Sequence, residues 1–158
     1  MNQREHILNA ALLAIGLGYV LEPAGDVATL EQIATVFIPI VLGALFPDVD
    51  AHYGRHRKAM HNLFVLAIFV AYPLYLANLY WVWLGVVTHL VLDIVGTTRG
   101  IALFYPLWSR EFGAPTGVTT SSRWAPLVTV IITGMEVAAL ALAIQYVPVE
   151  LGATALGV

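Results

Sequence analysis

Apolar residues fall into five segments, separated by polar stretches and one long loop. The segments lie near residues 7–21, 32–47, 62–79, 80–96 and 125–147. The first two are short against the roughly 20 residues of a perpendicular membrane span, so we expect them to stop partway or to thin the bilayer. The pattern predicts an all-α fold: a polytopic membrane helix bundle of about five spans.

The stretch from Leu63 to Leu92 contains a single His, Lys, Arg, Asp or Glu residue, His89. It is too long for one span, and bends at Tyr72-Pro73 or Ala77-Asn78 favour a tight hairpin. Before the last segment lies a loop of about 30 residues with an aromatic cluster that suits the headgroup region of a bilayer. This cluster consists of Phe104, Tyr105 and Trp108.

Composition supports a membrane location. The 158 residues include only 7 Lys and Arg and 10 Asp and Glu, which is 11% charged, whereas soluble domains average about 25%. Hydrophobic residues make up 59%, and the mean hydropathy is +0.82. These values exclude a soluble monomer, a disordered chain and a basic nucleic-acid binder. We expect one integral membrane domain over residues 1–158 and no nucleic-acid partner.

The N-terminal segment has Arg4 before an apolar run, as a signal peptide does. Glu5 and His6 interrupt the basic region, and no clear small-x-small cleavage site follows. We therefore interpret the segment as a retained first membrane helix.

The basic residues indicate an orientation. With five spans, all seven fall on one side of the membrane: Arg4, Arg55, Arg57, Lys58, Arg99, Arg110 and Arg123. The other side receives Glu22, Asp26, Glu31 and Glu150 and no Lys or Arg. Because cytoplasmic loops of membrane proteins carry the excess of Lys and Arg, the N-terminus is expected in the cytoplasm, in a multi-pass protein of the inner membrane.

The ionisable residues suited to metal binding gather near one membrane depth, the predicted cytoplasmic face. They are His6, Asp48, Asp50, His52, His56, His61, His89 and Asp93. The chain has no cysteine, so thiolate zinc sites and Cys nucleophiles are excluded and a metal would have imidazole and carboxylate ligands. Such ligands suit zinc, manganese or iron(II) in a hydrolytic site.

The spacings support a shared site. His89 and Asp93 are four residues apart, so on a helix they share a face and can bind one ion. Asp48 and Asp50 follow Pro47, and in an extended segment their carboxylates would point the same way. His56 and His61 fit a site if a loop carries the first and the following helix start carries the second.

Each feature also has a structural interpretation. His6 alone is most often an interfacial histidine. Asp48 and Asp50 fit a solvated loop end, and His52 and His56 fit a basic cluster that binds lipid headgroups. His89 and Asp93 fit a buried hydrogen-bonded pair or a proton path. Glu136, in the middle of the last segment, fits a protonated acid bonded to another helix. The joint placement of these residues favours a metal site.

Three segments of the chain resemble a known family: REHILNAALLAIG, GALFPDVDAHYGRHRKAMHNLFVLA and LGVVTHLVLDIVGTTRGIALFYPLW. They are similar to the YdjM-like membrane-bound metal-dependent hydrolases, also described as LexA-binding, inner membrane-associated hydrolases. The family pattern corresponds here to His6, Pro47, Asp48, Asp50, His56, Arg57, His61, Gly85, His89, Asp93, Tyr105 and Pro106. The resemblance covers about the first 108 residues. It implies an all-helical metal hydrolase of phosphoesters.

Together, the residues and the resemblance lead to a specific hypothesis. One to three divalent ions, with zinc favoured, would be bound by His6, Asp48, His61, His89 and Asp93. Asp50 and His56 would bridge ions or support the ligands. Asp50 would be the general base, and Arg57 would pair with phosphate oxygens. The expected substrate is a lipid-borne or small phosphoester that enters from the cytoplasmic leaflet.

The alternative hypothesis is a non-catalytic membrane protein, either a metal or proton carrier or a docking platform for a cytosolic partner. A carrier should have ionisable residues at all membrane depths, whereas here only Glu136 lies deeper than the face. A docking platform has no need for His89 and Asp93 inside a span.

Overall fold

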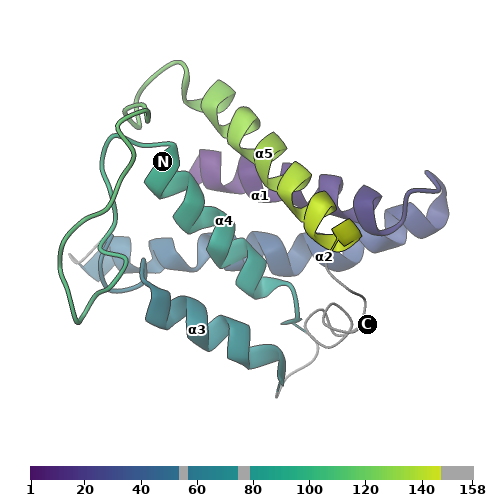
Figure 1. Cartoon of the computed structure of the whole chain (residues 1–158), viewed down its shortest axis with the longest axis horizontal. Helices are drawn as coiled ribbons and strands as arrows, with labels where there is room; N and C mark the ends of the chain where they lie inside the picture. Colours follow the sequence, from purple (N-terminus) through teal and green to yellow (C-terminus); the bar gives the residue numbers. More distant parts are fainter. Residues whose placement is uncertain (54–56, 75–78, 147–158) are drawn as a thin grey trace.

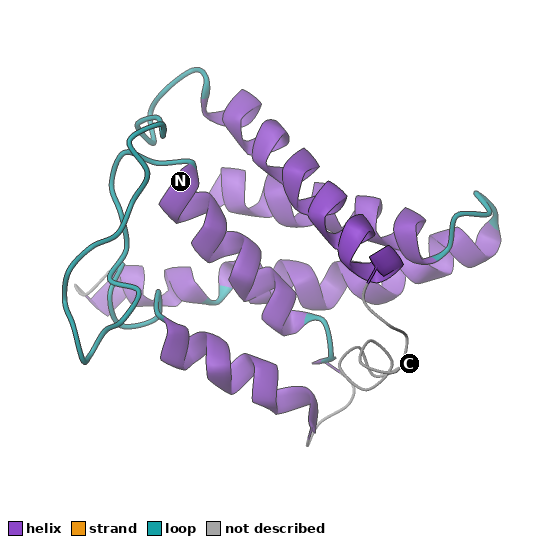
Figure 2. Ribbon diagram, viewed as in Figure 1, coloured by secondary structure: helices purple, strands orange, loops and turns teal. Residues whose placement is uncertain are grey.

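The computed structural model describes residues 1–53, 57–74 and 79–146, without the side chains of residues 51–53 and 74 (Figures 1 and 2). Its five α-helices are α1 (Gln3–Leu21), α2 (Val27–Leu45), α3 (Leu63–Ala71), α4 (Val82–Val95) and α5 (Ala125–Tyr146). The 3-10 helix η1 (Pro47–Tyr53) extends α2, and η2 (Tyr72–Leu74) extends α3. The described residues form no strand, so the all-α prediction is confirmed.

Helices α1 and α2 form an antiparallel hairpin because capping residues fix where each begins. The Asn2 side chain accepts hydrogen bonds from the backbone N–H groups of the first turn of α1, and Asp26 does the same for α2. Gly25, with φ +72°, supplies the left-handed turn between them. The hairpin brings the start of α1 and the end of α2 to the same end of the bundle.

Helices α2 and α4 approach closely where each has a glycine. A Cβ added to Gly43 would overlap the carbonyl oxygen of Val82, and one added to Gly85 would overlap that of Ile40. Small residues at such crossings let helix backbones pack directly against each other. The contact fixes α4 beside the C-terminal part of α2, from which η1 continues.

The N-terminus and the segment between α4 and α5 lie at the same end of the bundle (Figure 1). Residues 97–118 fold back on themselves through hydrogen bonds, including Phe112 N to Ile101 O at 2.8 Å, and through an isolated bridge between Thr97 and Val118. Phe104 and Trp108 stack there and remain about half exposed.

Helix α5 is joined to the bundle by buried polar contacts. The Thr88 hydroxyl donates to Glu136 Oε2 at 2.6 Å and accepts from Asn9 Nδ2 at 2.6 Å. Thr133 in turn donates to Asn9 Oδ1. These contacts confirm the interpretation of Glu136 as an acid that is bonded to another helix.

Helix lengths bear on the number of spans. Within the described residues, Val27–Asp50 and Ala125–Tyr146 are long and apolar enough to cross a membrane. By contrast, the 14 residues of α4 extend about 21 Å and the 9 residues of α3 about 14 Å, less than the roughly 30 Å of a hydrocarbon core. Two candidate spans are therefore established, and five spans remain a prediction. The bend expected at Ala77-Asn78 lies outside the described residues.

The glycine crossing gives a stability prediction. We expect Gly43→Ala and Gly85→Ala each to lower the free energy of unfolding by about 1–3 kcal/mol, because the new methyl group meets backbone that cannot move aside. Gly134→Ala in α5 is the matched control, since nothing lies within 4 Å of its added Cβ. Thermal unfolding in detergent, followed by tryptophan fluorescence, measures the effect. Equal stability of all three variants would contradict the packing described.

Candidate metal centre

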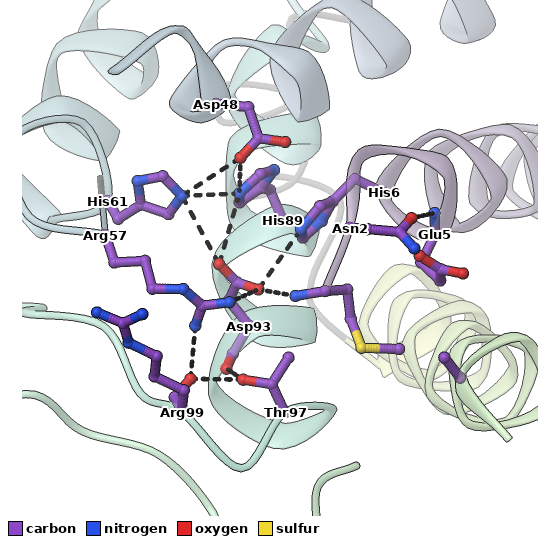
Figure 3. A network of polar contacts seen from close by, with 12 residues as sticks. Asn2, Glu5, His6, Asp48, Arg57, His61, His89, Asp93, Thr97 and Arg99 are labelled. Atoms are coloured by element: carbon purple, nitrogen blue, oxygen red, sulfur yellow. Dashed lines mark hydrogen bonds and ion pairs between the residues drawn. The ribbon is translucent and has the colours of Figure 1, made fainter. Parts of the chain in front are cut away.

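The polar side chains of the site come from separate elements and point toward one another (Figure 3). His6 comes from the first turns of α1, Asp48 and Asp50 from η1, and His89 and Asp93 from α4. His61 lies just before α3, where Asn62 caps the helix and donates to the carbonyls of Lys58 and Ala59 at 2.9 and 2.8 Å. The cap therefore fixes the turn that carries His61.

The two aspartates of η1 do not point the same way, so the expectation of an extended segment is wrong. Pro47 begins a 3-10 helix, in which side chains two residues apart diverge. Asp48 faces His61 Nε2 and His89 Nε2, whereas Asp50 faces His61 Nδ1 at 3.4 Å. The two carboxylates thus contact opposite nitrogens of the His61 ring.

Four ligand atoms converge in what we call the His/Asp cluster, formed by Asp48, His61, His89 and Asp93. The Nε2 atoms of His61 and His89 are 3.1 Å apart. Asp48 Oδ1 is 3.8 Å from both, and Asp93 Oδ2 is 3.6 and 3.8 Å from them. Ligand atoms of a tetrahedral site with bonds of about 2.0–2.1 Å lie about 3.3–3.4 Å apart. Within the cluster, Asp48, His61 and His89 have ligand atoms within 4.8 Å of one another and could hold a metal ion.

Hydrogen bonds orient both imidazole rings of the cluster. His89 Nδ1 is 2.6 Å from the carbonyl oxygen of Ala44, and His61 Nδ1 is 3.4 Å from Asp50 Oδ2. A carbonyl or carboxylate oxygen accepts hydrogen, so each Nδ1 is the nitrogen that donates, and each Nε2 faces into the cluster. A proton or a cation between these Nε2 atoms and the facing carboxylates would satisfy all of them.

Asp93 presents its other oxygen to a second group. Oδ1 lies 3.5 Å from His6 Nε2, and the His6 ring stacks on His89 with centroids 3.6 Å apart. His6 is 1% exposed, and neither ring nitrogen makes a hydrogen bond to the described residues. His6, His89 and Asp93 could also hold a metal ion. Asp93 is thus placed to serve both groups through its two oxygens.

Cationic groups also contact Asp93. The amino group of Met1 pairs with Oδ1, and Arg57 Nη2 lies 3.7 Å from the same atom. The pKa of the Met1 amino group is lowered from its usual value, because the effect of burial exceeds the opposing attraction of Asp93. Arg57 is buried with φ +70°, the left-handed region that non-glycine residues rarely adopt. Its Nη1 donates to the Arg99 carbonyl at 2.6 Å, which ties the site to the segment after α4.

Most of the site residues expected from the sequence come together in the structure. They are His6, Asp48, Asp50, Arg57, His61, His89 and Asp93. His56 lies outside the described residues, as does the side chain of His52. Asp50 is 2% exposed, so it is not part of a solvated loop end. It also accepts from the Met60 N–H at 3.1 Å.

Sequence reasoning missed three contributors to the site. The Ala44 carbonyl orients His89, but no side-chain pattern marks a backbone acceptor. The Met1 amino group pairs with Asp93, a main-chain contact that no side-chain pattern marks. Thr97 does carry a signal, because it follows Asp93 by four residues, and its hydroxyl donates to the Asp93 carbonyl at 2.8 Å.

We expect protein purified in detergent to retain a transition metal ion that the His61→Ala/His89→Ala double variant loses. Asp50→Ala should weaken binding by about 10- to 100-fold, because it removes the acceptor that orients His61. Elemental analysis and a competition titration with a chromogenic chelator measure both effects. Glu31→Ala, an exposed acid on α2, is the control. Undiminished metal in the double variant would rule out the cluster as the binding site.

Comparisons with known proteins give one positive result. The family model described as YdjM inner membrane protein matches residues 1–156. No curated protein and no solved structure matches the chain.

Proposed function

Since the chain belongs to the YdjM inner membrane protein family, whose description states a location and no reaction, we propose a function from the site itself. The protein is a membrane-bound metal-dependent hydrolase, and its substrate is a phosphoester carried by a lipid or a lipid-linked group. The observation that supports this most directly is the convergence of two imidazole nitrogens and two carboxylate oxygens in the His/Asp cluster.

Zinc is the proposed ion, because the cluster offers nitrogen and oxygen ligands and the chain has no thiolate. Manganese and iron(II) share these ligand preferences. Since Asp93 faces both His6 and the cluster, its two oxygens would be available to each group if two ions were bound. Such a pair falls within the one to three ions expected from the sequence.

When bound, a divalent ion lowers the pKa of a coordinated water to about 7 and stabilises charge on a reacting phosphate. The protein residues supply orientation and charge. Asp48 has the most accessible side chain of the cluster, 17% exposed against 0–1% for the other three. Water therefore reaches the cluster most readily beside Asp48.

The contacts of Asp50 favour an orienting role. The sequence suggested it as general base, but its carboxylate accepts from Met60 N–H and faces His61 Nδ1. It holds His61 with Nε2 directed into the cluster, as carboxylates commonly do for metal-binding histidines. Arg57, whose guanidinium reaches Asp93, provides positive charge for phosphate oxygens.

The lipid assignment draws on the surroundings of the site. Helix α3 has no buried residue, and α5 exposes large apolar side chains such as Ile131 and Met135, as helices that face lipid do. The site lies at the same end as the aromatic segment after α4 (Figure 1). All the basic residues follow the positive-inside pattern in a five-span topology, so we place this end, with the N-terminus, in the cytoplasm.

A proton carrier is the second candidate. One proton shared between His61 Nε2 and His89 Nε2 would also satisfy the facing lone pairs. Thr88, next to His89, bonds to Glu136 and extends the polar contacts toward α5. This hypothesis predicts proton movement without bound metal or turnover.

Turnover by reconstituted protein tests the proposal. We expect zinc-loaded protein to release phosphate from phosphatidic acid or a polyprenyl phosphate, or nitrophenol from bis-nitrophenyl phosphate. A chelator should abolish the activity and zinc restore it. Asp48→Asn should lower kcat by at least about 100-fold, since it removes a ligand charge, whereas Glu31→Gln should not. Metal-loaded, folded protein that turns over none of these substrates would overturn the hydrolase proposal.

A further inference from the structure

A cavity of about 440 Å³ lies beside the metal centre, between the start of the chain and the segment after α4. Its wall includes Arg57, Arg99, Thr97, Thr98, Thr119 and Thr120. The volume falls in the range of small-molecule sites, roughly 300–1,000 Å³. It is large enough for a phosphate group together with a small polar substituent.

The charge of the lining favours an anion. Two arginines, Arg57 and Arg99, contribute to the wall, and none of the described residues that line it is acidic. Thr98, Thr119 and Thr120 add hydroxyl groups at exposed positions. Guanidinium groups match the oxygens of phosphate in geometry as well as in charge, and hydroxyls donate to the remaining oxygens.

Arg57 connects the cavity to the metal centre. Figure 3 shows its guanidinium between Asp93 and the Arg99 backbone. Nη2 lies 3.7 Å from Asp93 Oδ1, and Nη1 donates to the Arg99 carbonyl. An anion in the cavity would therefore be separated from the Asp93 carboxylate by a buried cation, which offsets their repulsion.

Backbone contacts hold the two sides of the cavity together. Val118 N donates to the Gly96 carbonyl at 3.0 Å, and Thr98 N donates to the Val118 carbonyl at 3.3 Å. A Cβ added to Gly117 would overlap the backbone of Thr97, so residues 97 and 117 approach as closely as glycine allows. The cavity wall is therefore a packed structure.

From these observations we propose that the cavity is a phosphate subsite, which binds the phosphate-bearing headgroup of the substrate next to Asp93. That the bound phosphate belongs to a substrate rests on the proposed hydrolase function, whereas the binding of phosphate itself does not depend on that function. Arg99 and the threonines 98, 119 and 120 contact the phosphate. Arg57 is a positioning residue, which keeps the phosphate next to the metal centre.

Phosphate binding by purified protein tests this subsite. We expect inorganic phosphate to raise the thermal unfolding midpoint and to show a broadened phosphorus NMR signal. Arg99→Gln should raise the dissociation constant about tenfold, since a charge-assisted contact is lost. Arg110→Gln is the matched control, because Arg110 is also exposed on the segment but packs on Trp108 and Phe112, outside the cavity wall. A Thr119→Val/Thr120→Val variant should weaken binding without loss of charge.

Two outcomes would overturn the subsite. Either the wild-type protein shows no phosphate binding at millimolar concentrations, or Arg99→Gln and Arg110→Gln weaken it equally. Protein that binds phosphate as expected but has no turnover would support the subsite and count against the hydrolase. Protein that turns over phosphoesters but binds phosphate equally well in Arg99→Gln would support the hydrolase and contradict the subsite.

Vesicles identify the source of the phosphate. If the headgroup of a membrane lipid is the ligand, vesicles with phosphatidic acid should raise the unfolding midpoint more than phosphatidylcholine vesicles do, and Arg99→Gln should remove the difference. If the phosphate belongs to a soluble ester, glycerol 3-phosphate should give the shift and the two vesicles should be equal. Either result supports a phosphate subsite, whereas no shift with any of these ligands contradicts it.

Discussion

The negative charge of a buried carboxylate has to be compensated by polar or cationic groups, and the carboxylate that needs this compensation here is Asp93. It is 1% exposed, and an uncompensated charge at such a position costs several kcal/mol. The groups around it come from the start of α1, from the turn before α3 and from α4 itself. Satisfying one side chain thus ties together parts of the chain that are far apart in sequence.

The glycine crossing of α2 and α4 makes this arrangement possible. Because Gly43 and Gly85 have no Cβ, the two backbones pass close enough for the Ala44 carbonyl to reach His89 Nδ1. The same crossing brings η1, which continues from α2, alongside the cluster. Helix packing therefore determines which nitrogen of His89 faces its neighbours, and with it what the site can bind.

The sequence predicts part of this site for definite physical reasons. The four-residue spacing of His89 and Asp93 predicts a shared helix face, and the structure has both side chains in one cluster. The partners of each aspartate were less predictable. The backbone after Pro47 is a 3-10 helix, so Asp48 and Asp50 diverge to different atoms of His61. Local spacing cannot reveal such a difference, because it depends on where the turn before α3 places the imidazole.

The fold was predictable to a similar degree. Apolar segments predict helices, and helices form in all five, but hydropathy alone does not give helix length. Helix α3 ends at Ala71, before Tyr72-Pro73, where proline disfavours a continued helix. Similarly, the stacking of His6 on His89 depends on the packing of α1 against α4 and has no counterpart in residue spacing.

The strained backbone of Arg57 links two events that would otherwise be independent. Its Nη1 donates to the Arg99 carbonyl, and its Nη2 lies near Asp93 Oδ1. The Arg57 carbonyl also accepts from Ala102 N–H at 3.0 Å. A rearrangement of residues 99–102 would break the two hydrogen bonds between Arg57 and this segment and would let the guanidinium move away from Asp93. The electrostatic potential at Asp93 therefore depends on the conformation of residues 99–102, and a change in that segment would alter the potential at the site.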